Sequence, residues 1–306
     1  MFIKNDIYQL IIFIRFCFVA DYKTRFLKKN IFAKLDEKQQ KTMNNSPKEA
    51  LIVFMNSSFY KTSLSITKFA VLAILGGAFI ALGGLLSVMV AGGMSGIGAE
   101  NPGLIKFISG ATFPVGLIIV ALTKTDLFTS DCAAFTIPLW EKKMKFFTFL
   151  KYLFLSYIFN FIGVQFVAYF LSAHLGYFNV EPWQSYLHIL STAKVNQSWE
   201  MIFLKGIGAN WLVCLAIFLA FIAKDTVGKV IVIWIPIMMF VTLGYEHSIA
   251  NMFFIPAAIY SGAPITWGEF IFRNLIPATL GNFVGGGLLV GTAFWYLYLH
   301  KSEKLV

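Results

Sequence analysis

Six long apolar runs, separated by short polar connections, dominate the pattern of hydrophobic and polar positions along the chain. They span residues 69–91, 107–123, 152–171, 202–223, 230–243 and 275–299. Most of them reach the roughly 20 residues that a helix needs to cross about 30 Å of hydrocarbon. The pattern therefore predicts an all-α membrane protein with six transmembrane helices.

Polar residues interrupt this pattern at two places. The stretch GYEHSIANMFFIP (244–256) follows the fifth run, and the stretch TKTDLFTSD (123–131) follows the second. Non-helical backbone at membrane depth is tolerated only where it is buried in protein or lines a water-filled cavity. We therefore expect the second and fifth helices to be broken, near residues 123–131 and 244–250.

The two interruptions resemble each other. In each, an acid is followed five positions later by a second polar residue, then by Ile-Pro, and in the next run by Asn-Phe-x-Gly. The corresponding residues are Asp126 and Glu246, Asp131 and Asn251, Pro138 and Pro256, and Asn160 and Asn282. Three spans separate the matched elements, so the two halves would have opposite orientations. This arrangement predicts an inverted repeat, in which the broken helices mark a substrate path at the membrane midplane.

Composition and charge agree with a membrane protein. Of the 306 residues, 58% are hydrophobic and 13% are charged, whereas soluble domains carry about 25% charged residues. Basic residues concentrate in alternate connections, at Lys48, Lys61, Lys68, Lys142, Lys143, Lys145, Lys151, Lys224, Lys229, Lys301 and Lys304. Because cytoplasmic loops are rich in Lys and Arg, we expect a multi-pass protein of the plasma (cell inner) membrane, in contact with lipid and with both termini cytoplasmic.

The first 42 residues differ from the rest. They hold nine Lys/Arg and four Asp/Glu, and the remaining 16 against 11 is an excess that the positive-inside bias explains, so no nucleic-acid partner is expected. Their apolar segment, residues 7–20, contains Arg15 and is too short to span a membrane. We expect Met43 to be a natural start, residues 1–42 to be a disordered or artefactual extension, and residues 43–306 to form the channel domain. The alternative is a basic cytoplasmic arm lying on anionic lipid.

Histidine and cysteine supply the candidate chemistry. His247 is the histidine that falls inside a span, and histidine is the side chain whose proton moves near neutral pH. Such a group suits a small weak acid that crosses as an anion and takes up a proton. Cys17, Cys132 and Cys214 lack metal-ligand spacing, so we expect no metal site and no cofactor.

From about Met43 onward, the chain resembles the formate/nitrite transporter family, and the formate channel most of all. The resemblance is carried by Tyr60-Lys61, GGAFIALGG (76–84), DLFTS (126–130), GYEHSIANMFFIP (244–256) and NLIPATLGNFVGGGLLVG (274–291). It implies an aquaporin-like fold, a homopentamer with one pore in each protomer, and transport of small monovalent anions coupled to protons.

The resemblance also assigns roles to residues. It implies apolar constrictions formed by Leu127 with Phe113 on one side and by Phe240 on the other. His247 would be central, with Asn210, Thr129 and Asn251 as polar neighbours, and Lys61 and Lys194 would draw anions into the two mouths. The chain departs from the family at Lys124, where glycine is usual, and at Asp131. These two residues would compensate each other or face a subunit interface.

Other functions remain as alternatives. A neutral-solute pore of the aquaporin kind would have two Asn-Pro-Ala boxes, which neither interruption contains. Hydrosulfide, lactate or acetate could replace formate and nitrite in the same fold. An enzyme is not expected, because Glu246, His247 and Ser248 are adjacent on one backbone and cannot easily aim at a common atom.

Overall fold

Each apolar run forms helix in the computed structural model, which describes residues 44–300. The prediction about residues 1–42 lies outside this part of the chain. The helices, in chain order, are α2 (Pro47–Ser63), α3 (Ile66–Gly92), α4 (Ser95–Glu100), α5 (Pro102–Thr112), α6 (Val115–Thr123), α7 (Phe128–Ala134), α8 (Thr136–Trp140), α9 (Phe146–Ala168), η1 (Tyr169–Ala173), α10 (Trp183–Val195), α11 (Trp199–Ile222), α12 (Thr226–Thr242), α13 (Ser248–Tyr260), η2 (Glu269–Leu275), α14 (Ile276–Phe283), η3 (Val284–Thr292) and α15 (Ala293–Tyr298). The segments labelled η are π-helical.

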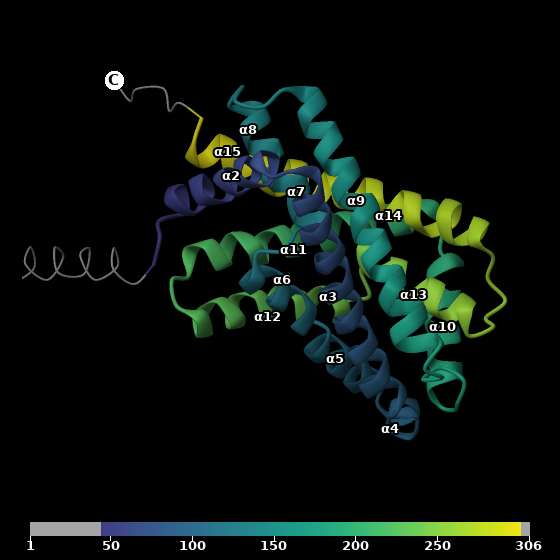
Figure 1. The fold of residues 1–306 in the computed structure, drawn as a ribbon. Helices are drawn as coiled ribbons and strands as arrows, with labels where there is room; N and C mark the ends of the chain where they lie inside the picture. Colours follow the sequence, from purple (N-terminus) through teal and green to yellow (C-terminus); the bar gives the residue numbers. More distant parts are fainter. Residues whose placement is uncertain (1–43, 301–306) are drawn as a thin grey trace, which may run out of the picture. The chain divides into compact units, whose positions relative to one another are not determined.

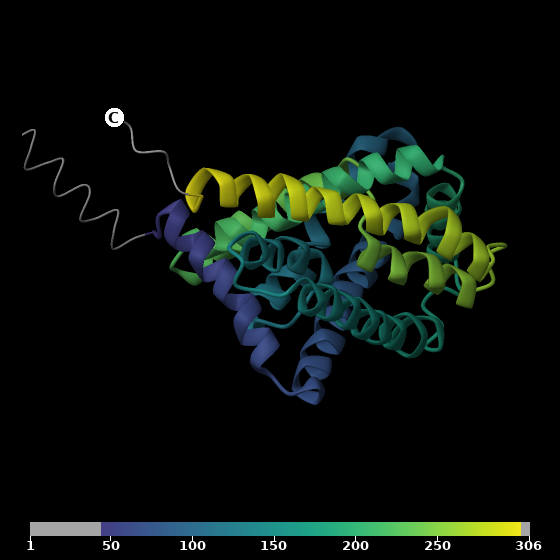
Figure 2. The same cartoon turned by 90° about the horizontal axis from the view of Figure 1, so that it is seen from above.

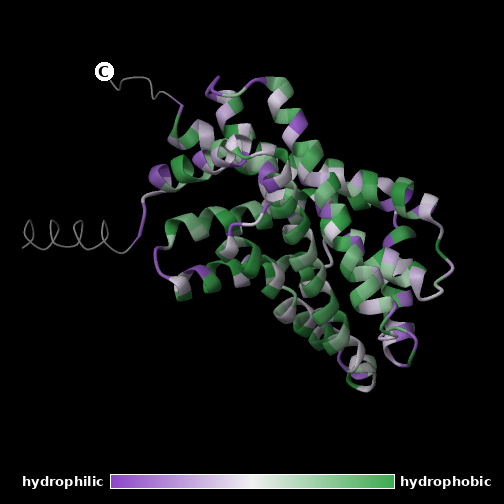
Figure 3. Ribbon diagram, in the orientation of Figure 1, coloured by the Kyte–Doolittle hydropathy of each residue, from purple (hydrophilic) through white to green (hydrophobic). Residues whose placement is uncertain are grey.

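Five helices in the described part are long and apolar enough, by length and composition, to cross a membrane. They are Ile66–Gly92, Pro102–Thr123, Phe146–Ala173, Trp199–Ile222 and Glu269–Tyr298, while α12 and α13 are shorter apolar helices. Hydrophobic residues cover most of their length, and polar residues gather at many of the connections (Figure 3). The all-α membrane class is confirmed, whereas a sixth crossing by α12 and α13 together stays a prediction.

The expected interruptions are present. Helix α6 ends at Thr123 and α7 begins at Phe128, and α12 ends at Thr242 and α13 begins at Ser248. We call residues 124–127 the first break and residues 243–247 the second break. In the second break Gly244 has φ +69°, a left-handed conformation in which glycine avoids a steric clash. The matching position of the first break is Lys124, which adopts φ 56° without that freedom.

Helix packing follows the internal repeat. Helix α3 packs along α9 and α11 along α14, while α2 touches α7 and α10 touches α13 (Figures 1 and 2). A Cβ built on Gly163 would lie 1.8 Å from the carbonyl oxygen of Ile74, and one on Gly285 would lie 2.2 Å from that of Ile207. Only glycine permits this approach of backbone to backbone. Because α2 contacts α7 and α10 contacts α13, the repeat also includes a short helix before the long helices of each half. The sequence pattern did not indicate these two helices as part of the repeat.

Candidate functional site

A buried asparagine holds the first break in place. The Asn160 side chain accepts a hydrogen bond from the Phe128 amide at 2.8 Å and donates to the carbonyl oxygens of Asp126 at 3.0 Å and Ala73 at 2.7 Å. Backbone groups that leave a helix inside an apolar region need such partners. Asn160 thus replaces the helical hydrogen bonds that the break removes.

Asn282 does the same for the second break. Its side chain accepts from the Ser248 amide at 2.8 Å and donates to the carbonyl oxygens of Glu246 at 2.9 Å and Gly206 at 2.8 Å. These contacts explain why Asn-Phe-x-Gly occurs in both halves of the sequence, because each asparagine closes the break of its own half. These matched contacts support the internal repeat, while its inversion stays a prediction.

His247 connects the second break to α7, the half-helix that follows the first break. Its Nε2 lies 3.0 Å from the Thr129 hydroxyl, and its Nδ1 accepts a hydrogen bond of 3.1 Å from the Ala250 amide as the N-cap of α13. Since Nδ1 is an acceptor, a neutral ring carries its proton on Nε2 and donates it to Thr129. The Thr129 hydroxyl can then donate its own proton to an anion.

Aromatic side chains cover the imidazole. The rings of Phe240 and His247 are stacked with centroids 5.8 Å apart, and Phe113 lies 5.8 Å from Phe240 and 6.2 Å from Phe254. Phe113 therefore groups with Phe240, whereas the expectation from the resemblance put it with Leu127. The reason is that Phe113 directly follows α5, which packs against α12, the helix that carries Phe240. Leu127 is fully buried in the first break.

Asn210 and Asn251, the other expected polar neighbours, form their hydrogen bonds with groups other than the imidazole. Asn210 donates to the carbonyl oxygens of Thr129 at 3.0 Å and Asn282 at 2.6 Å, so it fixes the residue that His247 contacts. Asn251 instead donates to the Glu246 carboxylate at 2.6 Å and to the side-chain oxygen of Asn274 at 2.8 Å. Asn251 belongs to the charged network of the second break.

That network centres on Glu246. Its carboxylate contacts Lys194 at 3.1 Å and accepts hydrogen bonds from Gln197 at 3.1 Å and Asn274 at 3.3 Å. Sequence reasoning missed Asn274 and Gln197. An amide directly before the last apolar run was the available signal for Asn274, whereas nothing in the sequence linked Gln197 to Glu246.

At the first break, one lysine meets two acids. Lys61 on α2 contacts the carboxylates of Asp126, at 2.7 Å, and Asp131. Ser156 donates to the other oxygen of Asp126 at 2.5 Å. The partner of Asp131 is therefore Lys61 and not Lys124, which corrects the compensating pair expected from sequence. Asp131 is fully buried in the protomer, so it does not face a subunit interface either.

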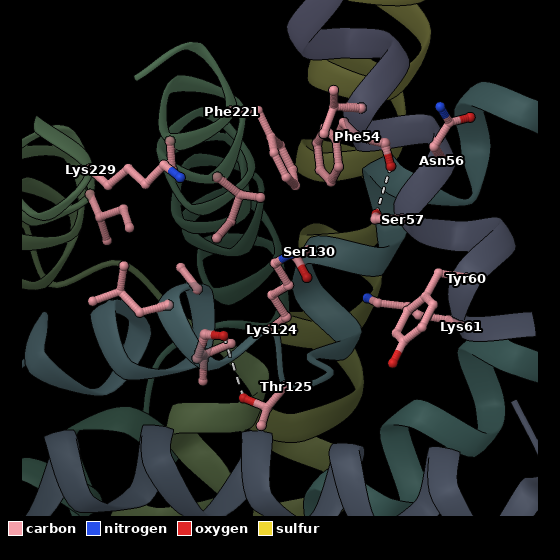
Figure 4. Close-up of a pocket in the computed structure, with 17 residues that line it drawn as sticks. Phe54, Asn56, Ser57, Tyr60, Lys61, Lys124, Thr125, Ser130, Phe221 and Lys229 are labelled. Carbon is pink, nitrogen blue, oxygen red and sulfur yellow. Dashed lines mark hydrogen bonds between the residues drawn. The ribbon is translucent and has the colours of Figure 1, made fainter. Parts of the chain in front are cut away.

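A cavity of about 330 Å³ adjoins the first break. Lys61 from α2, Lys124 from the first break and Lys229 from α12 line it together with Ser130, and Figure 4 shows the three ammonium groups turned toward its interior. The rest of the lining is apolar or uncharged, without an acidic residue. The cavity is thus a cationic recess directly beside the buried cluster of Lys61.

Comparison with known proteins identifies the family of the chain. The sequence profile of the formate/nitrite transporter family matches residues 48–296. The chain is 41% identical over 255 residues to a probable formate transporter of Methanothermobacter thermautotrophicus, covering 79% of this chain and 92% of that one. It is 36% identical over 263 residues to a formate channel of Bacillus thuringiensis, covering 85% and 98%.

Solved structures of the same family also align with the chain. An ion channel of the formate/nitrite transporter family aligns with a TM-score of 0.73 and 26% identity, covering 81% of this chain and 98% of that one. A pentameric formate channel with formate bound aligns with a TM-score of 0.65 and 30% identity, covering 76% and 98%. These relatives are transporters and channels rather than enzymes. The chain is a multi-pass membrane protein that belongs to the formate/nitrite transporter family.

Proposed function

We propose that this protein moves small monovalent weak-acid anions of the formate and nitrite type across the membrane, coupled to a proton through His247. The observation that carries the proposal is the 3.0 Å contact between His247 and Thr129, which joins the second break to the first turn of α7 at a buried point. A hydroxyl that accepts from an imidazole and keeps its own proton for donation suits a small oxyanion. Apolar rings next to it disfavour a bare charge.

The path is proposed to have a charged mouth on each side. Lys61 and Lys194 each contact the acid of a different break, and Lys124 and Lys229 add positive charge to the cavity beside the first break. A positive mouth raises the local concentration of anions over about one Debye length, roughly 8–10 Å at moderate salt. Leu127 and the group of Phe113 and Phe240 are then the dry constrictions that an ion meets next.

Proton exchange through the imidazole has a structural requirement. Nδ1 accepts a hydrogen bond from the Ala250 amide, so this cap bond must first open for a proton to enter the ring there. The charged ring then passes its Nε2 proton to Thr129, the Thr129 hydroxyl gives its own proton to the anion, and the ring is left neutral. The anion leaves the constriction as the neutral acid and loses the proton on the far side. This route predicts that transport accelerates when the pH on the side of uptake is lowered.

Assembly and placement follow from the relatives and from charge. A solved neighbour is a pentameric formate channel, and we propose a homopentamer with one path in each protomer. Large hydrophobic side chains are exposed along α3, α9 and α11, including Phe154 and Leu204, which fits contact with lipid and sister protomers. The distribution of lysines supports the plasma (cell inner) membrane with both termini cytoplasmic.

Flux measurements with purified protein in liposomes test the proposal. Formate, nitrite, lactate, acetate and hydrosulfide are compared at two pH values, and osmotic water and glycerol flux are measured in the same vesicles. We expect saturable formate or nitrite uptake that is faster at the lower pH. Faster flux of lactate, acetate or hydrosulfide would change the substrate within the same fold, and glycerol flux without anion flux would indicate a neutral-solute pore.

A further inference from the structure

At the first break, one ammonium from α2 contacts the carboxylate of Asp126 in the break and that of Asp131 on α7. The side chains of Asp126 and Asp131 are completely buried, and the side chain of Lys61 is 11% exposed. If all three are ionised, the cluster carries a net charge of −1 in an apolar region. An uncompensated buried charge is costly, because nothing replaces the water that it has lost.

Within residues 44–300, Asp131 has no second cation as an ion-pair partner. Helix α7, which carries Asp131, is packed by α2, α9, α11, α13, α14, α8 and η3. The titratable groups that face it are Lys61 from α2, Cys214 from α11, and Tyr152 and Tyr157 from α9, while His247 caps α13 and reaches Thr129. The sequences of α8, α14 and η3 contain no titratable side chain. Lys61 is thus the single ammonium of the described chain in contact with the two acids, whereas Lys124 and Lys229 line the adjoining cavity and form no ion pair with either.

One carboxylate oxygen of Asp131 is buried without a partner for a negative charge in the part of the chain that the structure describes. Its Oδ2 is buried and has no hydrogen-bond partner among the described residues, whereas its Oδ1 contacts Lys61. An ionised oxygen in that position would be desolvated without compensation. A proton bound to the pair removes the net charge of the cluster.

We propose that Asp126 and Asp131 together bind one dissociable proton beside Lys61, so that the first break is a proton-binding site separate from His247. The proton comes from water in the adjoining cavity, which Lys61 and Ser130 line, and returns to it when the pair ionises. Because the carboxylates interact, the proton belongs to the pair rather than to either residue.

The second break lacks such a site. At the position that corresponds to Asp131 it has Asn251, which donates to Glu246, and Glu246 is paired with Lys194. One acid and one ammonium balance without a proton. The two ends of the path therefore differ in their response to pH, and this consequence for transport rests on the function proposed above.

Infrared spectroscopy of the purified full-length protein tests the proton directly. At neutral pH we expect the C=O stretching band of a protonated carboxyl group, which D₂O shifts. Asp131→Asn and Asp126→Asn should each abolish the band, since either change leaves one acid against Lys61. Glu200→Gln, at an exposed acid of α11, is the matched control and should leave the band unchanged.

Flux measurements distinguish the proton-site proposal from the proposal of anion transport. Asp131→Asn should keep uptake but lose its response to pH on the side of the first break, while the response on the other side remains. Asn251→Asp should introduce a second carboxyl band. A band that persists in both aspartate variants, or the absence of any such band in the unchanged protein, would overturn the proton site and leave the transport proposal standing. The absence of any anion flux through the protein without substitutions would overturn the transport proposal instead.

Discussion

Asn160 and Asn282 occupy equivalent places in the two halves and make the same set of hydrogen bonds. Each accepts, at 2.8 Å, from the first amide of the half-helix that follows its break, and each donates to the carbonyl oxygen of the acid that precedes it. Both side chains are fully buried. The shape of each break thus depends on one carboxamide.

Asn160→Ala and Asn282→Ala should therefore destabilise the protein. Each leaves buried backbone groups without partners, at a cost of about 1–3 kcal/mol for each group. Thermal unfolding in detergent, followed by the loss of the oligomer on a sizing column, measures the effect. Asn196→Ala, at an exposed residue after α10, is the control and should stay within about 0.5 kcal/mol. Equal stability of all three variants would contradict the role of the carboxamides.

His247→Asn separates the capping role of His247 from its proton chemistry. Asparagine is a good N-cap and can still accept from the Ala250 amide, but its amide does not exchange a proton near neutral pH. We expect a folded oligomer whose acid-stimulated anion uptake falls by about 10²-fold or more, the lower end of general acid–base effects. His247→Ala should lose both uptake and the cap. Acid-stimulated uptake that survives in the asparagine variant would reduce His247 to a structural residue.

Lys61 and Lys229 line the same cavity but should respond differently to substitution. Lys61→Ala leaves two buried carboxylates without their cation, so we expect a loss of stability of about 3–5 kcal/mol. Lys229 has no ion pair with a described residue, and Lys229→Ala should raise the KM for the anion without affecting unfolding. Uptake measured at low salt and at about 1 M salt, where the Debye length is about 3 Å, should show the KM difference disappear. A KM effect that is independent of salt would argue against electrostatic collection.

Lys124 tests the backbone of the first break. A residue other than glycine in the left-handed region costs roughly 1–2 kcal/mol, so Lys124→Gly should be more stable than Lys124→Ala, which keeps the conformation and loses only the ammonium. Thermal unfolding compares the two. Both variants remove the ammonium of Lys124 from the cavity, so their KM values for the anion at low salt should agree. The difference between them in stability then measures the backbone strain alone. The reverse order of stability would show that the break relaxes when Lys124 is replaced.

The sequence predicted the fold more completely than the site. The helix breaks, the all-α class and the link between Asn160 and Asn282 were visible because polar residues stand out in apolar runs. Contacts made by residues from distant helices were not visible. Lys61 lies 70 residues before Asp131, and nothing in the pattern indicated that α2 returns to the first break. The grouping of Phe113 with Phe240 has the same cause, since this ring contact depends on how the end of α5 packs against α12.

The contacts of Gly163 with Ile74 and of Gly285 with Ile207 have a mechanical consequence. Backbones that touch directly cannot slide past each other without a collision, and they carry no flexible side chain that could yield. Each pair, α3 with α9 and α11 with η3, should thus behave as a stiff frame. We therefore expect movement to be confined to the short loops 124–127 and 243–247, as small local rearrangements rather than a rocking of one half against the other.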